Sequence, residues 1–193
     1  GLYREGPCCE EFTQHAQSWA VLNGMLSQAK AAEVLGRTFQ ERDVLRCYFS
    51  ACYELFRACE KAACYELTKK QMEWWIRLLE EHCTTCPETP FNSRSECHAW
   101  SALPMYELIA VIAGIRRESG HPERVEICPH MDYLPDLEGK VITEYGEIVF
   151  RYGPEKAGMR YEIMLPEGME GRFLGSGGET VLLRNGKNVI VQS

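Results

Sequence analysis

The chain has 193 residues, an apolar share of 45% and a net charge of −7, which predict one or two globular domains with a substantial core. No basic run occurs, so a nucleic-acid partner is not expected. No apolar run approaches the ~20 residues that span a bilayer, so no membrane partner is expected either. The first residues, Gly1 to Gly6, contain neither an initiator Met nor a signal peptide, and we expect an internal cut or a processed end.

Helical periodicity extends over residues 1 to about 118. Five helices are predicted, at 11–25, 28–35, 42–63, 67–82 and 97–115. Gly36 is expected to end the second helix and Ser95 to cap the fifth. Because proline lacks a backbone N–H, Pro104 should kink the fifth helix or split it in two.

After Gly120 the pattern changes to short alternating runs separated by glycine or proline. The runs are 124–128, 140–145, 147–152, 159–165, 180–183 and 189–191. They predict a small antiparallel β-sandwich of six to eight strands. Asn185-Gly186 predicts a two-residue hairpin between the last two runs, and Tyr145-Gly146-Glu147 another turn. Gly175 to Gly178 lacks the end of a phosphate-binding loop, so we expect a connection between strands.

The predicted fold class is therefore α+β multidomain: a partial α/α toroid of about five helices over 1–118, followed by a sandwich over 119–193. Five helices do not close a toroid of twelve. The apolar faces of 42–63 and 67–82 should then be partly exposed. We expect a homo-oligomer, or a missing N-terminal portion of the same protein, to cover them.

Ten cysteines are many for a chain with few marks of a disulfide scaffold, which predicts a reducing, cytoplasmic compartment. Three of them are expected to be small buried residues within one helix: Cys47, Cys52 and Cys59. Cys83-Thr84-Thr85-Cys86 lies near Cys97-His98, so zinc binding and redox chemistry are alternatives to coincidence. Coincidence is the preferred interpretation, and neither a metal nor a cofactor is predicted.

The loop between the fourth and fifth helical patterns holds the candidate site. Glu88 lies between Pro87 and Pro90, which should stiffen its surroundings, and His98 and Trp100 follow. A carboxylate that handles protons, an imidazole that bonds hydroxyls and an indole that stacks on a pyranose are the parts of a sugar site.

Each residue also has a plainer interpretation. Glu88 could be a surface glutamate, and His98 a core or capping histidine. Trp100 could pack in the core, since ideal helical spacing turns it about 200° from His98. Arg94 could either bond and orient Glu88 or satisfy a helix end.

The run Arg94-Ser95-Glu96-Cys97-His98-Ala99-Trp100-Ser101 resembles the C-terminal part of the bacterial α-L-rhamnosidases, a glycoside hydrolase family. Weaker resemblances extend over most of the chain, at His15–Gln17, Cys47–Ser50, Leu55–Ala58, Val125–Pro129, Pro166–Gly168 and Gly186–Val189. The resemblance implies an (α/α)6 barrel that hydrolyses terminal α-L-rhamnosides with inversion and without a cofactor. Residues 1–118 would be the C-terminal portion of that catalytic domain, and 119–193 its C-terminal sandwich.

The resemblance places the general base at Glu88 and a sugar contact at His98, with Trp100 and Arg94 as further substrate-binding residues. The family's general acid lies in the earlier half of the barrel, where nothing in this chain matches. The chain is thus expected to be a fragment, inactive alone, of an enzyme that acts on rhamnose-containing glycosides or oligosaccharides. The alternatives are a non-catalytic carbohydrate-binding or interaction module working through the sandwich, and a structural domain that binds metal through cysteine.

Overall fold

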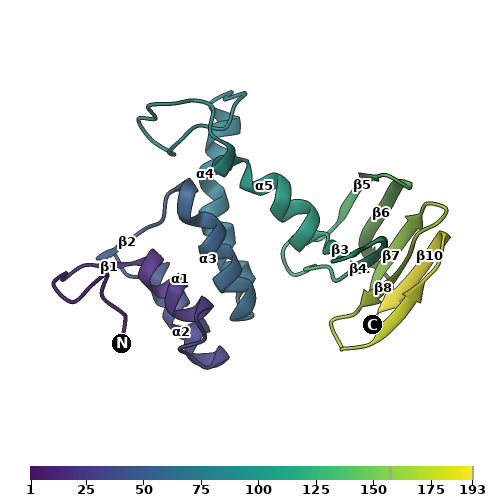
Figure 1. Ribbon diagram of the computed structural model, residues 1–193, viewed down its shortest axis with the longest axis horizontal. Coiled ribbons are helices and arrows are strands. Elements are labelled where there is room, and N and C mark those ends of the chain that lie inside the picture. Colours follow the sequence, from purple (N-terminus) through teal and green to yellow (C-terminus); the bar gives the residue numbers. More distant parts are fainter. Residues whose placement is uncertain (157, 193) are drawn as a thin grey trace. The chain divides into compact units, whose positions relative to one another are not determined.

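The computed structural model describes residues 1–156 and 158–192 (Figure 1). The chain divides into two compact units, Gly1–Pro104 and Met105–Ser193. The first is mainly helical and the second mainly strand, which confirms the predicted α+β class. Within the described residues, every helix is too short or too polar to cross a bilayer.

The first unit packs α1, α2 and α3 side by side (Figure 1). Its elements are β1 (Phe12–Thr13), α1 (Gln14–Leu22), α2 (Gln28–Thr38), β2 (Val44–Leu45), α3 (Phe49–Lys61), η1 (Tyr65–Thr68), α4 (Lys69–Glu80) and η2 (Ala99–Ala102). β1 and β2 form a short parallel pair that joins the start of α1 to the segment before α3. The helix α5 (Leu103–Tyr106) continues from η2.

Three of these helices end with a residue in the left-handed conformation: Gly24 after α1 (φ 72°), Ala63 after α3 (φ 53°) and His82 after α4 (φ 58°). At each end two N–H groups turn back to carbonyls of the last turn, as in the Schellman motif. The predicted role of Gly36 as a terminator is wrong. Gly36 lies inside α2, which continues to Thr38.

Replacing Ala63 by Gly should stabilise the first unit. A residue with a side chain is destabilised by about 1–2 kcal/mol in the left-handed region. Glycine avoids this strain, but it makes the unfolded chain more flexible, which offsets part of the gain. We expect a net gain of about 0.5 kcal/mol in the free energy of unfolding, measured with urea. Ala32→Gly is the matched control, because it places glycine inside α2 and should destabilise by about 1 kcal/mol.

A buried amide network holds the segment before α3. The Gln14 side-chain oxygen accepts from the Cys47 N–H (2.9 Å), and the Gln71 amide donates to the Cys47 carbonyl (2.6 Å). Both glutamines are fully buried. Because these bonds come from α1 and α4, they fix the backbone of Cys47 between the two helices.

The apolar face of α3 is mostly buried, and it includes Cys52 and Cys59 as predicted. Cys47 is also buried, but it precedes α3 instead of lying within it as predicted, and burial raises the pKa of its thiol to about 12. On α4, by contrast, Ile76 is 53% and Leu79 is 71% exposed. The expectation of a partly exposed apolar face is therefore confirmed for 67–82 and wrong for most of the face of 42–63.

The second unit is a sandwich of two four-stranded sheets, with strand orders β10-β7-β6-β5 and β3-β4-β8-β9. Its elements are η3 (Glu107–Ile112, a π-helix), β3 (Ile115–Glu118), β4 (His121–Ile127), β5 (Leu137–Thr143), β6 (Gly146–Glu155), β7 (Gly158–Leu165), β8 (Glu170–Leu174), β9 (Thr180–Leu183) and β10 (Gly186–Gln192). The predicted range of six to eight strands is confirmed, although the sequence patterns miss β3 and β8. All neighbouring strands are antiparallel except β4 and β8.

One predicted connection in the sandwich is wrong and two are confirmed. Asn185-Gly186 does not form a hairpin, because β9 pairs with β8 while β10 pairs with β7 in the other sheet. The Asn188 side chain bonds both the N–H (3.1 Å) and the carbonyl (2.8 Å) of Arg184, which shapes this crossing. The turn before Gly146 does join β5 to β6, and the loop 175–178 joins β8 to β9.

The predicted helix over 97–115 is wrong at both ends. The helical path runs without a gap from η2 through α5, which contains Pro104, to η3, so the predicted split at Pro104 is wrong, and β3 begins at Ile115. Gly114 makes this change of direction with φ 70°, and its carbonyl accepts from the Cys128 N–H (3.0 Å). Residues 105–118 therefore pack with the sheets. The assignment of domains at 118 and 119 stays a prediction.

Candidate active site

Backbone hydrogen bonds close the loop between α4 and η2. The Glu88 N–H donates to the Ser95 carbonyl (2.8 Å), and the His98 N–H donates to the Cys86 carbonyl (2.6 Å). The Ser93 hydroxyl accepts from the Glu88 N–H (3.0 Å) and donates to the Ser95 carbonyl (2.5 Å). These bonds hold the stretch before Glu88 alongside the stretch that leads to His98.

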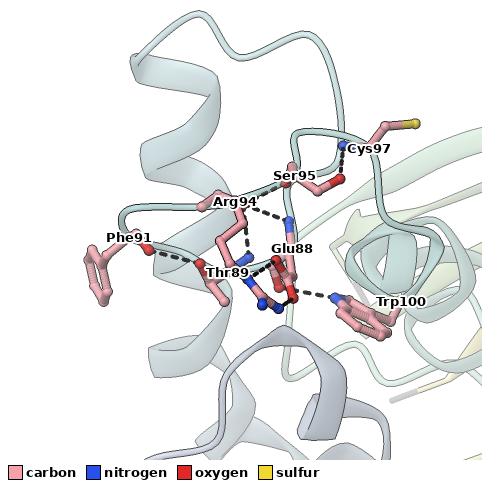
Figure 2. Close-up of polar contacts among 8 residues, drawn as sticks. Glu88, Thr89, Phe91, Arg94, Ser95, Cys97 and Trp100 are labelled. Carbon is pink, nitrogen blue, oxygen red and sulfur yellow. Dashed lines mark hydrogen bonds and ion pairs between the residues drawn. The ribbon is translucent and has the colours of Figure 1, made fainter.

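The Glu88 carboxylate is bound by Arg94 on both oxygens (Figure 2). The Arg94 Nε lies 3.1 Å from one oxygen, and a terminal nitrogen bonds the other. The Glu88 side chain is only 12% exposed, whereas Arg94 is 85% exposed. Of the two interpretations of Arg94, the structure therefore supports the bond to Glu88.

Arg94 also sets the charge state of Glu88. Its hydrogen bonds, together with the charges of Arg94 and His98, hold the pKa of the Glu88 carboxyl below its usual value, although partial burial opposes this. The carboxylate thus stays ionised at pH values where an ordinary glutamate begins to take up a proton.

Trp100 joins Glu88 to His98. Its indole N–H donates to the Glu88 carbonyl (3.0 Å; Figure 2), and its ring lies 4.3 Å from the His98 ring at an angle of 32°. The expectation that the two side chains point apart is wrong, because η2 begins at Ala99 and His98 is in extended conformation. The prediction that Ser95 caps this helix is wrong for the same reason: His98 occupies the N-cap position. Trp100 is 43% exposed, so it is not a core residue.

The His98 ring has an unused polar atom. Its Nδ1 is buried and has no hydrogen-bond partner within the described ranges. The His98 carbonyl accepts from the Ser101 hydroxyl (2.9 Å), which orients the backbone but leaves the ring nitrogen free. A buried, unpaired imidazole nitrogen can bond a hydroxyl group of a ligand.

An aromatic cluster that the sequence analysis missed anchors the Glu88 loop. The Phe91 ring lies 5.9 Å from Trp74 on α4 and 6.4 Å from Tyr48 before α3. The Arg77 guanidinium lies 5.7 Å from the centre of the Phe91 ring. No signal in the sequence relates these residues, because the contacts join segments far apart in the chain.

The side chains of His15 and the CxxC pair, the other candidates from the sequence, do not contribute to the Glu88 site. His15 is exposed at the start of α1, in a pocket that Glu88 does not line.

Within the described residues, the cysteines show no sign of a metal or redox site. Cys83 donates to the Thr85 carbonyl (3.3 Å). The ten cysteines are present as thiols, not as disulfides. Residues 1–156 and 158–192 contain no group of three or more His, Cys, Asp or Glu arranged to hold a metal ion.

Replacing Arg94 by Ala should raise the pKa of Glu88, because it removes the largest cause of the depression. A depressed pKa in the folded state means that the pair contributes stability at neutral pH and loses this contribution as the pH falls through the carboxyl range. A ¹³C NMR titration of the Glu88 carboxyl measures the shift directly. Arg151→Ala, which removes the partner of Glu138 instead, should leave the titration of Glu88 unchanged.

No family model matches the chain, and no curated protein matches its sequence. Solved structures do match. A GH78 family rhamnosidase of Bacillus sp. GL1 is 25% identical with a TM-score of 0.65, over 86% of this chain and 20% of that chain. The α-L-rhamnosidase of Aspergillus terreus is 17% identical with a TM-score of 0.71, over 99% of this chain and 26% of that chain. The Streptomyces avermitilis α-L-rhamnosidase complexed with L-rhamnose is 14% identical with a TM-score of 0.76, over 93% of this chain and 21% of that chain.

The chain has the fold of the C-terminal part of an α-L-rhamnosidase. It spans between a fifth and about a quarter of the length of the rhamnosidases that it matches. The loop that carries Glu88, His98 and Trp100 is thus part of a chain with a rhamnosidase fold.

Proposed function

We propose that the chain is a fragment of an α-L-rhamnosidase-like glycoside hydrolase, in which Glu88 is the general base of an inverting reaction. The observation that carries the proposal is the closed loop on which Glu88, His98 and Trp100 are held against one another in a rhamnosidase fold. Inversion requires a carboxylate that deprotonates a water on the face of the sugar opposite the leaving group.

The environment of Glu88 suits this role. Arg94 keeps the carboxylate ionised, and the backbone on both sides of Glu88 is pinned by Ser95 and Trp100. A base that takes a proton from water needs a free lone pair, and each Glu88 oxygen keeps one beside its single bond to Arg94.

His98 and Trp100 would form part of the sugar pocket. The unpaired Nδ1 of His98 can bond a hydroxyl of rhamnose, and the exposed part of the Trp100 ring can lie against the pyranose. Arg94 would border the same pocket.

We further propose that the general acid is supplied from outside this chain. Residues 1–118 would be the C-terminal portion of an (α/α)6-barrel catalytic domain, and 119–193 its C-terminal sandwich. The exposed apolar side chains of Ile76 and Leu79 support a further covering segment, either the N-terminal portion of the enzyme or a second copy of the chain. The substrate would be a rhamnose-containing glycoside or oligosaccharide.

The alternative, a carbohydrate-binding module working through the sandwich, has less support. Sugar-binding surfaces use exposed aromatic rings. Tyr145, in the turn before β6, is 37% exposed, but four rings on the strands form a buried cluster. These rings are Phe150, Tyr152, Tyr161 and Phe173.

A chimera tests the proposal. The chain would replace the matching fifth of the Bacillus sp. GL1 rhamnosidase, and hydrolysis of 4-nitrophenyl α-L-rhamnoside would be followed for the chimera and for the isolated chain. We expect hydrolysis by the chimera and none by the isolated chain. A chimera that folds but does not hydrolyse the rhamnoside would contradict the proposal.

A further inference from the structure

A second concave site lies where α1 and α3 begin. The pocket has a volume of about 300 Å³, enough for one pyranose ring. Its lining includes charged, polar and aromatic side chains: Glu5, His15, Arg46, Tyr48 and Ser50. This mixture is typical of sites that bind small polar ligands.

Arg46 is held rigidly at this pocket. One terminal nitrogen donates to the Gln71 side-chain oxygen (3.0 Å), and the guanidinium lies 5.2 Å from the centre of the Trp74 ring. Gln71 is itself fully buried and bonded to the Cys47 carbonyl. The guanidinium is therefore fixed by Gln71 and Trp74, while Arg46 itself remains exposed to solvent.

The charge of Arg46 is not compensated. In the part of the chain that the structure describes, no carboxylate lies within ion-pair distance of Arg46, whereas Arg94 is paired with Glu88. Glu5, the acidic residue of the pocket, accepts a hydrogen bond from the Thr13 hydroxyl instead. A positioned guanidinium without a counter-ion is a receptor for a carboxylate, which it can bind through parallel N–H bonds.

The neighbours of Arg46 suit a sugar ring. Tyr48 is 50% exposed and presents an aromatic ring, while His15 and Ser50 offer groups that bond hydroxyls. We propose that this pocket binds a uronate, a sugar that carries a carboxylate.

The pocket is connected to the Glu88 loop. Tyr48, which lines the pocket, and Trp74, which carries the Arg46 guanidinium, both contact the Phe91 ring of that loop. The uronate would thus be a further unit of the same oligosaccharide whose rhamnose reaches Glu88. This placement rests on the proposed function, whereas the binding of a uronate does not.

A titration of the intact chain tests the proposal. Methyl β-D-glucuronide and its neutral counterpart, methyl β-D-glucoside, would be added to ¹⁵N-labelled protein while the signals of the Arg46 Nε and of the Ser50 and Ala51 amides, which line the pocket, are followed. We expect the glucuronide to bind at least about tenfold more tightly, which corresponds to one charge-assisted bidentate contact. Arg46→Gln should abolish this preference. Arg42→Gln, an exposed arginine outside the pocket, should keep it.

A second variant distinguishes the loss of the guanidinium contact from a loss of structure. Arg46→Lys keeps the charge but loses the planar fork, so it should retain part of the preference with an unchanged amide spectrum. Equal affinity for the two glycosides, a preference that persists in Arg46→Gln, or signals that shift only outside the pocket would overturn the proposal. Glu88→Gln should leave glucuronide binding unchanged. An inactive chimera that still binds glucuronide would therefore contradict the proposed function alone.

Discussion

Glu88→Gln in the rhamnosidase chimera should lower kcat for 4-nitrophenyl α-L-rhamnoside by about 10²–10⁴-fold, the contribution of a positioned general base. The amide has nearly the same shape as the carboxylate, and it can still accept one hydrogen bond from Arg94. It cannot accept a proton from water at any relevant pH. KM should change little, because the sugar contacts of His98 and Trp100 remain.

The control for this variant is Glu96→Gln, an exposed glutamate on the same loop that takes no part in the Glu88–Arg94 pair. It should leave kcat within about twofold of the parent, since exposed substitutions have small effects. Similar losses in both variants would show that the loop, and not the carboxylate of Glu88, determines the rate.

Gly114→Ala should destabilise the sandwich unit by at least about 3 kcal/mol. A Cβ at this position would lie 2.1 Å from the Cys128 carbonyl oxygen, and the backbone has φ 70°. The added methyl must therefore push β3 away from β4, which it joins at the start of the sheet. Urea unfolding gives the loss of free energy, and hydrogen exchange should locate it in the amides of β3 and β4.

Gly120→Ala separates the effect of the close contact with Cys128 from the effect of the left-handed backbone. Gly120 has a similar φ of 79°, but nothing lies within 4 Å of its Cβ position. It should cost only the roughly 1–2 kcal/mol of left-handed backbone strain. Equal losses in the two variants would show that the close contact with Cys128 contributes nothing.

The sequence predicted the parts of the fold that depend on periodicity. The helices of the first unit and most strands of the second follow from apolar spacing, although α3 begins at Phe49 and not near Arg42. Errors arose where a local signal competed with a distant partner. Asn185-Gly186 favours a hairpin locally, but β10 pairs with β7 instead of β9. Gly114 similarly ends a helix because it meets Cys128, a contact that no local pattern reveals.

The candidate site shows the same division. The sequence indicated which residue types belong together, but not that Trp100 would lie against His98. That contact depends on the bond between the His98 N–H and the Cys86 carbonyl, which keeps His98 extended and delays the start of the helix. No sequence pattern indicates Arg46, because its position depends on Gln71 and Trp74, which lie on the helix after α3.

The central claim, that Glu88 is the base of an inverting rhamnosidase, is tested most directly by the reaction of the Glu88→Ala chimera with azide. Azide can occupy the space of the lost side chain and attack the anomeric carbon without deprotonation, while the aglycone leaves. The measurement is the rate with and without azide, together with the configuration of the product by ¹H NMR. We predict a rate that is low without azide, is raised by it, and yields β-L-rhamnosyl azide. Hydrolysis at the parental rate without azide, or formation of the α-azide, would contradict the claim.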